Sequence, residues 1–345
     1  MDLEICISSD DKYCIHMGVC IISIAENSSS NCDNLNIHIL NNGISKDNLE
    51  KLNQIQNKYP KLNFYFYSVA EYFSKNNFNQ SIQDKLKGSE FFNLLGISAY
   101  SRLFLADILP NNIDKILYLD ADTIVLGNLK ELYEIDLSNY YCAGVINMNG
   151  NSTKSFYKGK QFDTPFVNSG VLLINVDKWR KDDFIGSAIE LINEYPDKDY
   201  LHDQNIINIL SKGQVCLVDP KFNTMSEYYY VDYEKYLKLN SYFSPVDKFY
   251  SVEQMNDALK NPTIVHFLSQ IWDRPWIKQT GFIKHKIKNP FNKKYLEYRN
   301  ISPWKDDSLT KIDLSFKQKL YYEIIRGIMI YSPAYILVLL QKIKN

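Results

Sequence analysis

The stretch that decides the fold is KILYLDADTIVLGNL, residues 115–129. An apolar run fills its first half, and two aspartates, Asp120 and Asp122, follow directly. Residues i and i+2 of an extended chain point to the same side, so these carboxylates repel each other unless a cation lies between them. Hard divalent cations take oxygen ligands and share them with substrate phosphates. The stretch therefore predicts a buried strand that ends at a metal-bridged diphosphate, with two solvated acids in a surface turn as the alternative.

Strand-like and helix-like segments alternate along the rest of the chain. Short apolar runs predict further strands at 3–9, 35–40, 63–69, 141–146, 170–175, 215–219 and 263–267. The spacing of apolar residues predicts helices around 17–24 and over 45–59, 98–109, 183–194 and 203–211. Ser45 is the expected cap of the second helix. Such alternation is typical of an α/β fold with a mainly parallel sheet, in which ligands bind outside the carboxyl ends of the strands.

Composition limits the classes of function. The chain has 345 residues, 45% of them hydrophobic, which is ample for a buried core. Its 39 basic and 40 acidic residues nearly cancel, which argues against a nucleic-acid-binding protein. The six cysteines form no C-x-x-C pair, so we expect reduced thiols and no cysteine metal site. The first residues, MDLEICISSDD, are acidic where a secretory signal would be basic and then apolar, which predicts a cytoplasmic protein.

The motif SSDDKY, residues 8–13, follows the first predicted strand and so belongs to the same carboxyl edge. Asp10 can accept a hydrogen bond from a base N–H, and Tyr13 can stack on the base. In a chain with 26 tyrosines, a turn tyrosine that binds no ligand is the alternative.

Two later motifs carry amides and an acid. FVNSGVLLIN, residues 166–175, places Asn168 ahead of a buried strand, where it is either a ligand or a cap, and Gly170 either belongs to a site or permits a bend. HDQNIIN, residues 202–208, places Asp203 at a helix start, where an acid is also explained by the helix dipole.

The last motif, HFLSQIWDRPW, spans residues 266–276. His266 follows an apolar strand, and Arg274, Pro275 and Trp276 close the motif. A single histidine after such a strand is either a metal ligand or a core residue with its hydrogen bonds satisfied.

In this order the motifs resemble those of the retaining family-8 glycosyltransferases, in particular the bacterial galactosyl- and glucosyltransferases that extend lipopolysaccharide cores. Glycogenin is a more distant relative. The resemblance runs from residue 3 to about 276 and rests on SSDDKY, SAYSRL, KILYLDADTIV, FVNSGVLLIN, HDQNIIN and HFLSQIWDRPW. It implies a GT-A nucleotide-diphospho-sugar transferase fold with a Rossmann-like, mixed but mainly parallel sheet. The catalytic domain is expected over 1–280, followed by a C-terminal helical and basic extension over 281–345.

The resemblance also implies a metal site and a set of donor-binding residues. Asp120, Asp122 and His266 would bind manganese, with magnesium as the alternative ion. The donor would be UDP-galactose or UDP-glucose. The residues implied in binding it are Ser8, Asp10, Tyr13, Arg102, Asn168, Ser169, Asp203, Gln204 and Arg274.

Within that set the roles differ. Asp10 and Tyr13 would hold the uracil, and Arg102 would contact the sugar or the diphosphate. Asn168 and Asp203 would hydrogen-bond the transferred hexose.

The resemblance places Gln204 beside the anomeric carbon. A retaining hydrolase has a carboxylate nucleophile there, and an amide is a poor nucleophile. We therefore expect front-face attack, in which the departing phosphate oxygen takes the proton of the acceptor. Asp203 as a nucleophile is the alternative. The metal and Arg274 would stabilise the charge on the leaving UDP.

Two departures from the family pattern bear on the site. The family has His-x-x-Gly-x-x-Lys-Pro-Trp as its last motif, whereas here Ser269 replaces the glycine, two residues are added, and Arg274 stands at the lysine position. Arginine still neutralises phosphate, and does so bidentately where lysine acts as a point charge. Lys12 stands where the family often has a small polar residue near the ribose.

The expected acceptor is a saccharide or glycolipid of a cell-surface glycan, with the polar segment 147–165 as the predicted acceptor loop. Three other functions stay open: a self-glucosylating primer like glycogenin, a non-catalytic nucleotide-sugar-binding protein, and a membrane-docked assembly protein. The intact acidic pair and Gln204 argue against a protein that only binds the nucleotide sugar.

The C-terminal extension lies outside the resemblance. Between residues 278 and 299 there are seven lysines or arginines and a single acid, Glu297. The apolar run 328–340 is interrupted by Ser332 and Pro333, and is too short for a membrane-spanning helix, which needs about 20 apolar residues. The segment predicts peripheral binding to the cytoplasmic face of the inner membrane, with a helix packed on the core as the alternative.

Overall fold

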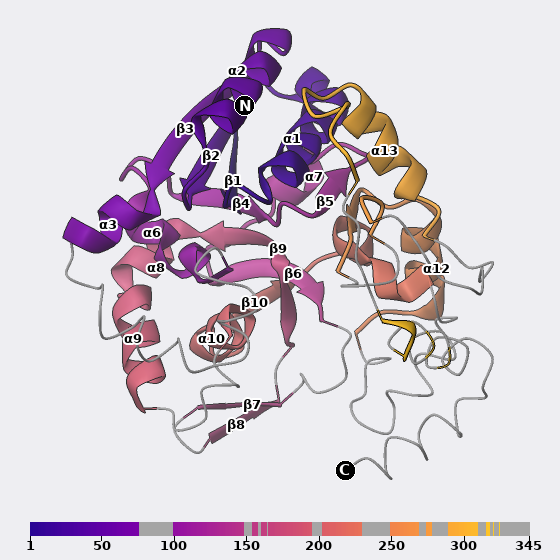
Figure 1. The fold of residues 1–345 in the computed structure, drawn as a ribbon. Coiled ribbons are helices and arrows are strands. Elements are labelled where there is room, and N and C mark those ends of the chain that lie inside the picture. The colour runs from indigo at the N-terminus through magenta and orange to yellow at the C-terminus, as the bar shows by residue number, and fades with distance from the viewer. Residues whose placement is uncertain are drawn as a thin grey trace.

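The computed structural model describes residues 1–75, 99–147, 154–157, 160–163, 165–194, 202–229, 249–268, 274–277, 289–309, 315–317, 320 and 324. In this described part, seven strands form the main sheet in the spatial order β10-β6-β9-β4-β1-β2-β3 (Figure 1). They are β1 (Leu3–Ser9), β2 (Leu35–Asn41), β3 (Leu62–Ser68), β4 (Lys115–Leu119), β6 (Cys142–Ile146), β9 (Val167–Asn175) and β10 (Val215–Leu217). A smaller sheet contains β5 (Thr123–Val125), β11 (Thr224–Met225) and β12 (Ile264–His266), and β7 (Lys154–Tyr157) pairs with β8 (Lys160–Asp163).

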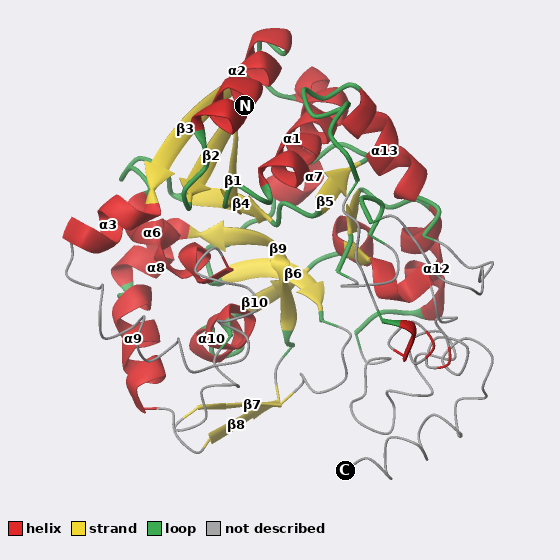
Figure 2. Cartoon of the chain, viewed as in Figure 1, coloured by secondary structure: helices red, strands yellow, loops and turns green. Residues whose placement is uncertain are grey.

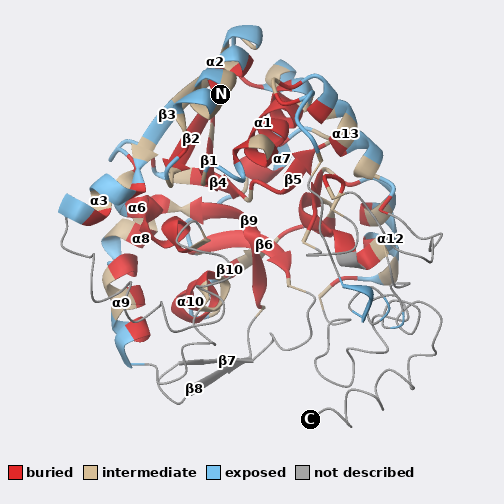
Figure 3. Cartoon of the chain, viewed as in Figure 1, coloured by how far each residue is buried: buried red, intermediate tan, exposed pale blue. Residues whose placement is uncertain are grey.

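Helices cover both faces of the main sheet (Figure 2). The α-helices are α1 (Cys14–Ser28), α2 (Lys46–Lys58), α3 (Val69–Lys75), α6 (Leu105–Ile108), α7 (Lys130–Tyr133), α8 (Val176–Lys181), α9 (Phe184–Glu194), α10 (Asp203–Leu210), α12 (Val252–Lys260) and α13 (Asn292–Asn300). The 3₁₀ helices are η1 (Ser29–Asn31), η2 (Ser101–Phe104), η4 (Pro220–Asn223) and η5 (Ser226–Tyr229). One core contains residues of α1 and α2, and another contains residues of α6, α8, α9 and α10. The strands between them are largely buried, except the edge strand β3 (Figure 3).

Strand β1 shows why the apolar runs become strands. Ile5 and Ile7 belong to the core on the α1 side, and Cys6, between them, belongs to the core on the other side. Successive side chains of a strand point to opposite faces, and both faces are covered here, so the run has no polar alternation. All six cysteines lie in the described part and are free thiols.

The sheet is mixed but mainly parallel, which confirms the predicted fold class. Strands β1, β2, β3 and β4 run parallel, as do β6 and β10, whereas β9 is antiparallel to both β4 and β6. Because β9 is reversed, its first residues lie beside the carboxyl end of β4. The strand starts at Val167 and not at residue 170, so Asn168 is part of the strand, whereas the sequence predicted that it precedes the strand.

The turn after β4 leads into the smaller sheet. Strand β5 pairs antiparallel with β12, and Thr123 lies opposite His266. The smaller sheet therefore meets the main sheet at the carboxyl end of β4, the edge where the sequence predicted a site. This junction brings the end of β12 to Asp120 and Asp122.

The helix predictions are confirmed with one difference. Ser45 caps α2 and accepts a hydrogen bond from the Asn48 N–H. Within the segment predicted as one helix over 98–109, residues 101–108 form η2 followed by the short α6. Nε of Arg102, within η2, donates to the carbonyl of Ala99 at 3.0 Å.

The start of the C-terminal extension packs against the first helix. Helix α13 contacts α1, and the hydroxyl of Tyr295 lies 2.6 Å from Nδ1 of His16. Trp304 lies against Gly18, where a Cβ atom would be 2.2 Å from Cζ3 of the indole. Its Nε1 donates to Oδ1 of Asn48 at 2.8 Å. Residues 289–309 therefore share the core of the preceding domain.

Several sequence predictions fall on residues that the structure does not describe. They concern Ser269, the apolar run 328–340 and about half of the segment 147–165, whose described residues include the β7–β8 pair. Among the described residues, no helix is long and apolar enough to cross a membrane.

We predict that Trp304→Ala lowers the free energy of unfolding by about 3–5 kcal/mol, because it removes a buried indole and leaves a cavity over Gly18. Ile301→Ala is the matched control, since Ile301 is 47% exposed on the same segment, and should change stability by no more than about 0.5 kcal/mol. Urea unfolding followed by circular dichroism measures both. Equal losses in the two variants would contradict the packing described here.

Candidate functional site

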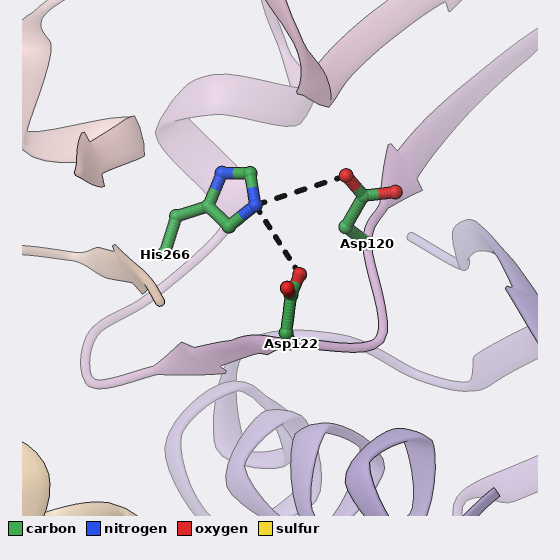
Figure 4. A group of neighbouring side chains, drawn as sticks. All are labelled: Asp120, Asp122 and His266. Carbon is green, nitrogen blue, oxygen red and sulfur yellow. Dashed lines mark ion pairs between the residues drawn. The ribbon is translucent and has the colours of Figure 1, made fainter. Parts of the chain in front are cut away.

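Asp120, Asp122 and His266 come together from two sheets. The aspartates lie in the turn between β4 and β5, and His266 is the last residue of β12. Nε2 of His266 lies 3.7 Å from Oδ2 of Asp120 and 3.2 Å from Oδ1 of Asp122. Figure 4 shows the imidazole ring pointing at both carboxylates. One ligand atom from each residue lies within 4.8 Å of the others, an arrangement that suits a cation bound by two oxygens and one nitrogen.

The carboxylate of Asp122 keeps its charge. Burial favours the neutral form of Asp122, but hydrogen bonding and charge from His266, together with the charge of Arg274, lower the pKa of this carboxyl to about 2. Nη2 of Arg274 lies 3.3 Å from Oδ2 of Asp122. The side chains of Asp120 and Asp122 are 23% and 11% exposed, so an ion can reach them from solvent.

Gly170 leaves the space in which the cluster fits. Its carbonyl accepts a hydrogen bond from the Asp120 N–H at 2.8 Å, so β9 lies directly against the acidic turn. A Cβ atom at Gly170 would lie 2.1 Å from Cε1 of His266 and 2.6 Å from Oδ2 of Asp120. These distances are too short for nonbonded atoms. The glycine is therefore required by close approach, and not by a bend in the backbone.

Arg102 is a buried cation that contacts two acids. Its Nη2 donates to Oδ1 of Asp120 at 2.7 Å, and its Nε lies 3.1 Å from Oδ2 of Asp203. Its Nη1 donates to the carbonyl of Ser169 at 2.7 Å, and the guanidinium lies 4.4 Å from the ring centre of Tyr118. Burial alone would lower the pKa of Arg102, but the charges of Asp120 and Asp203 raise it, so the side chain stays charged. Its observed role is to neutralise these carboxylates, and its contact with a sugar or diphosphate stays a prediction.

Asn168, Ser169, Asp203 and Gln204 form a polar cluster where β9 meets α10. Nδ2 of Asn168 and the backbone N–H of Ser169 both donate to Oε1 of Gln204, each at 3.1 Å. The hydroxyl of Ser169 donates to Oδ2 of Asp203 at 3.0 Å. The structure thus joins four residues that the sequence placed in two separate motifs.

Tyr13 and Arg274 lie on the other side of the acidic turn. Nη1 of Arg274 donates to the Tyr13 hydroxyl at 2.6 Å, while its Nη2 reaches Asp122. Tyr13 is 37% exposed, which leaves part of its ring accessible for stacking. Oδ1 of Asp10 accepts a hydrogen bond from the Tyr13 N–H at 2.8 Å and so closes the turn ahead of α1. Arg274 therefore connects the tyrosine to the acidic cluster.

His16 supports this side of the site and was not singled out in the sequence. Its ring lies 5.2 Å from that of Tyr13 and 4.1 Å from that of Trp276, centre to centre. Burial, the largest cause, lowers the pKa of His16 to about 3, so the ring is neutral at pH 7. The only signal in the sequence is its helical spacing from Tyr13.

Two further residues lie at the site, Ser8 and Asn223. Ser8 lies near the carboxyl end of β1, but its Oγ lies 2.7 Å from that of Ser101 and accepts a hydrogen bond from Nδ2 of Asn42 at 3.0 Å. These observed partners are protein groups, and contact between Ser8 and a substrate stays a prediction. Asn223, which sequence reasoning missed, has its Oδ1 3.2 Å from Nδ1 of His266. It ends η4 in a stretch with no recognisable motif, so nothing in the sequence marks it.

The chain is similar to known proteins over most of its length. A family model described as glycosyl transferase family 8 matches residues 4–280. General stress protein A of Bacillus subtilis (strain 168) is 25% identical over 300 residues, which cover 86% of this chain and 92% of that protein. The lipopolysaccharide 1,2-glucosyltransferase of Escherichia coli is 24% identical over 325 residues, covering 91% of this chain and 83% of that protein.

A solved structure shares the fold. The crystal structure of the galactosyltransferase LgtC in complex with donor and acceptor sugar analogs matches with a TM-score of 0.61 and 22% identity, and covers 92% of this chain and 100% of that chain. This likeness confirms the GT-A fold expected from the sequence.

We predict that Gly170→Ala lowers the free energy of unfolding by about 1–3 kcal/mol, because the added methyl group cannot fit between His266 and Asp120 without moving one of them. Gly127→Ala is the matched control, since its Cβ would lie 3.4 Å from Cγ2 of Thr263, an ordinary contact. Denaturant unfolding of both variants provides the measurement. The close approach at Gly170 is refuted if its alanine variant is as stable as the control.

Proposed function

Because this chain belongs to glycosyl transferase family 8, we propose that it moves a hexose from a UDP-sugar donor to a saccharide acceptor with the help of a divalent metal ion. The sugar is galactose or glucose. We propose either hexose because the Escherichia coli relative is named as a glucosyltransferase and LgtC as a galactosyltransferase.

The observation that carries the proposal is the cluster of Asp120, Asp122 and His266 beyond the carboxyl end of β4. Two carboxylate oxygens and one imidazole nitrogen suit Mn²⁺, with Mg²⁺ as the alternative. Gly170 supports the fit, since the missing Cβ keeps the space beside Asp120 and His266 clear. A bound Mn²⁺ would supply Lewis-acid stabilisation to the diphosphate of the donor.

We place the UDP moiety between Tyr13 and the acidic cluster. Tyr13 offers an accessible ring for stacking on uracil, and Asp10, only partly buried, offers an acceptor for its N–H. Arg274 contacts both Tyr13 and Asp122, so its guanidinium stands between the proposed positions of the base and the metal. A diphosphate at this position would be bound by the fork of N–H donors that a guanidinium presents.

The neighbouring polar groups favour front-face attack with retention. Oε1 of Gln204 already accepts two hydrogen bonds, and Asp203 is buried and bound to Arg102 and Ser169. These contacts lower the nucleophilicity of both candidate nucleophiles. In the proposed step an acceptor hydroxyl attacks the anomeric carbon while the bond to UDP breaks, and its proton passes to the departing phosphate oxygen. Arg274 stabilises the charge that develops on UDP. Asp203 as a covalent nucleophile is the alternative mechanism.

We propose a glycan or glycolipid of the cell surface as the acceptor, because the Escherichia coli relative is named for lipopolysaccharide. Binding of the extension to a membrane surface is also a proposal. Among its described basic residues, Lys293 and Lys294 are exposed and pair with Glu297, whereas Arg299 is buried and donates to the carbonyl of Lys305. The electrostatic argument for a membrane therefore rests on the lysines between residues 278 and 288.

Two alternative functions predict different experimental results. A self-glucosylating primer would gain mass in steps of one hexose on the protein itself. A protein that only binds nucleotide sugars would release no UDP from any donor. Screening UDP-sugars with purified protein and Mn²⁺, with free UDP and the mass of the protein as the two readouts, distinguishes these functions and identifies the hexose.

We predict that Asp120→Ala or Asp122→Ala lowers transferase activity at least about a hundredfold, which corresponds to roughly 2.7 kcal/mol of barrier. Each change removes an oxygen ligand and leaves the diphosphate charge less screened. EDTA should have the same effect on the unaltered protein, and Mn²⁺ should restore activity. Asp177→Ala is the control, an acid that is 44% exposed in its side chain and pairs with Lys181, and should keep full activity. Full turnover in EDTA would exclude the metal.

We also predict that Tyr13 and Gln204 affect different quantities. Tyr13→Ala should weaken UDP binding by about 1–3 kcal/mol, because it removes a stacking surface, whereas Tyr13→Phe should retain most of the affinity. Gln204→Ala should slow transfer more than it weakens UDP binding. Calorimetry with UDP and steady-state kinetics give the two quantities, and the reverse order would show that the two residues have been assigned to the wrong parts of the donor.

A further inference from the structure

Two backbone N–H groups determine how the amide side chains of the site are oriented. A backbone N–H can only donate, so the side-chain atom that faces it must be an oxygen. The N–H of Gly170 donates to Oδ1 of Asn168 at 3.0 Å. The N–H of Ser169 donates to Oε1 of Gln204 at 3.1 Å. Nδ2 of Asn168 then has the correct orientation to donate to the same oxygen of Gln204.

Asn223 extends this orientation to the histidine of the acidic cluster. Oδ1 of Asn168 accepts a second hydrogen bond, from Nδ2 of Asn223 at 2.9 Å. The other end of the Asn223 amide, its Oδ1, therefore faces Nδ1 of His266 at 3.2 Å. Asn223 is 0% exposed and Asn168 is 5% exposed, so solvent does not compete for these contacts. Because Oδ1 of Asn223 is an acceptor, Nδ1 of His266 must carry a hydrogen.

We infer that Asn223 is a positioning residue for the metal and donor site of the proposed function. It holds the ring of His266 with the hydrogen on Nδ1, which leaves Nε2, the atom that faces Asp120 and Asp122, as the nitrogen that binds a metal. The same amide holds Asn168 in the orientation that donates to Gln204. Asn223 thus couples the metal ligand to the residue proposed beside the anomeric carbon.

The choice of an amide at this position has a physical reason. Histidines that bind metals usually donate their second ring N–H to a carboxylate, a backbone carbonyl or water, which fixes the tautomer and the ring orientation. A carboxylate here would add negative charge close to Asp120 and Asp122. A serine would offer a single oxygen, in place of the two separate side-chain atoms of asparagine that contact His266 and Asn168. Asparagine supplies a neutral acceptor for the ring and a donor for Asn168 at the same time.

The test measures Mn²⁺ affinity without any donor, by following the free-ion signal in electron paramagnetic resonance. Asn223→Ala should bind Mn²⁺ about 10–100-fold more weakly than the unaltered protein, the usual cost of removing such a partner. Asn223→Asp keeps an acceptor for Nδ1 of His266, so its affinity should stay within about threefold. Asn175→Ala is the control, because Asn175 ends β9 at the opposite end from Asn168 and its amide donates to the carbonyl of Leu137.

The Asn223→Asp variant also tests the two parts of the inference separately, namely the contact of Asn223 with His266 and its contact with Asn168. Its carboxylate cannot donate to Oδ1 of Asn168, and no orientation of that amide then satisfies both Gly170 and the new oxygen. Donor turnover by Asn223→Asp should therefore fall at least about tenfold in kcat while Mn²⁺ binding persists. If the alanine variant does not fold, this pairing of retained metal affinity and lost kcat still tests the inference.

The outcomes distinguish this inference from the proposed function. If the unaltered protein binds no Mn²⁺, the proposed metal site is wrong and the inference falls with it. If the unaltered protein binds Mn²⁺ and Asn223→Ala binds it equally well, only the inference is wrong. Loss of affinity in Asn223→Asp, or in Asn175→Ala, would also overturn it, because the effect would then not depend on the acceptor for His266.

Discussion

The repulsion between two carboxylates in one tight turn is the constraint on which the rest of the site depends. Asp120 and Asp122 stand at the end of β4, and Asp203 lies nearby across Arg102. Burying such charges is costly unless positive groups and hydrogen bonds compensate. Arg102 and Arg274 supply this compensation, and each comes from a different part of the chain. Buried charges that are so costly in free energy are expected at a site that binds a charged ligand, such as a diphosphate.

The topology of the sheets explains how these groups meet. In an all-parallel sheet, only the carboxyl ends of strands would contribute to this edge. Here β9 is reversed, so Asn168, Ser169 and Gly170 lie near its start and yet beside Asp120. The smaller sheet adds His266 through the pairing of β12 with β5. Gly170 permits both arrangements together, because the strand, the ring and the carboxylate approach too closely for a side chain.

Aromatic packing ties the start of the C-terminal extension to this site. Tyr295 of α13 lies against Trp276 and His16, and His16 in turn lies against Tyr13. The segment that carries Arg274 and Trp276 is thereby supported from α1 and α13. The extension had been expected either to lie on a membrane or to pack on the core, and residues 289–309 do pack on the core. Its apolar run 328–340 lies outside the described residues.

The sequence alone determined the elements and the chemistry of the acidic turn. Apolar runs such as LEICISS and KILYL predict strands of a sheet covered on both faces, and Asp-x-Asp after such a run predicts a cation between the two carboxylates. The order of the motifs indicated the family and most of the residues that the structure brings together. Only the tertiary structure decided the contacts that depend on strand direction and on orientation. The reversed β9, the close approach at Gly170, the double contact of Arg102 and the amide of Asn223 leave no local pattern, because each arises between segments distant in the chain.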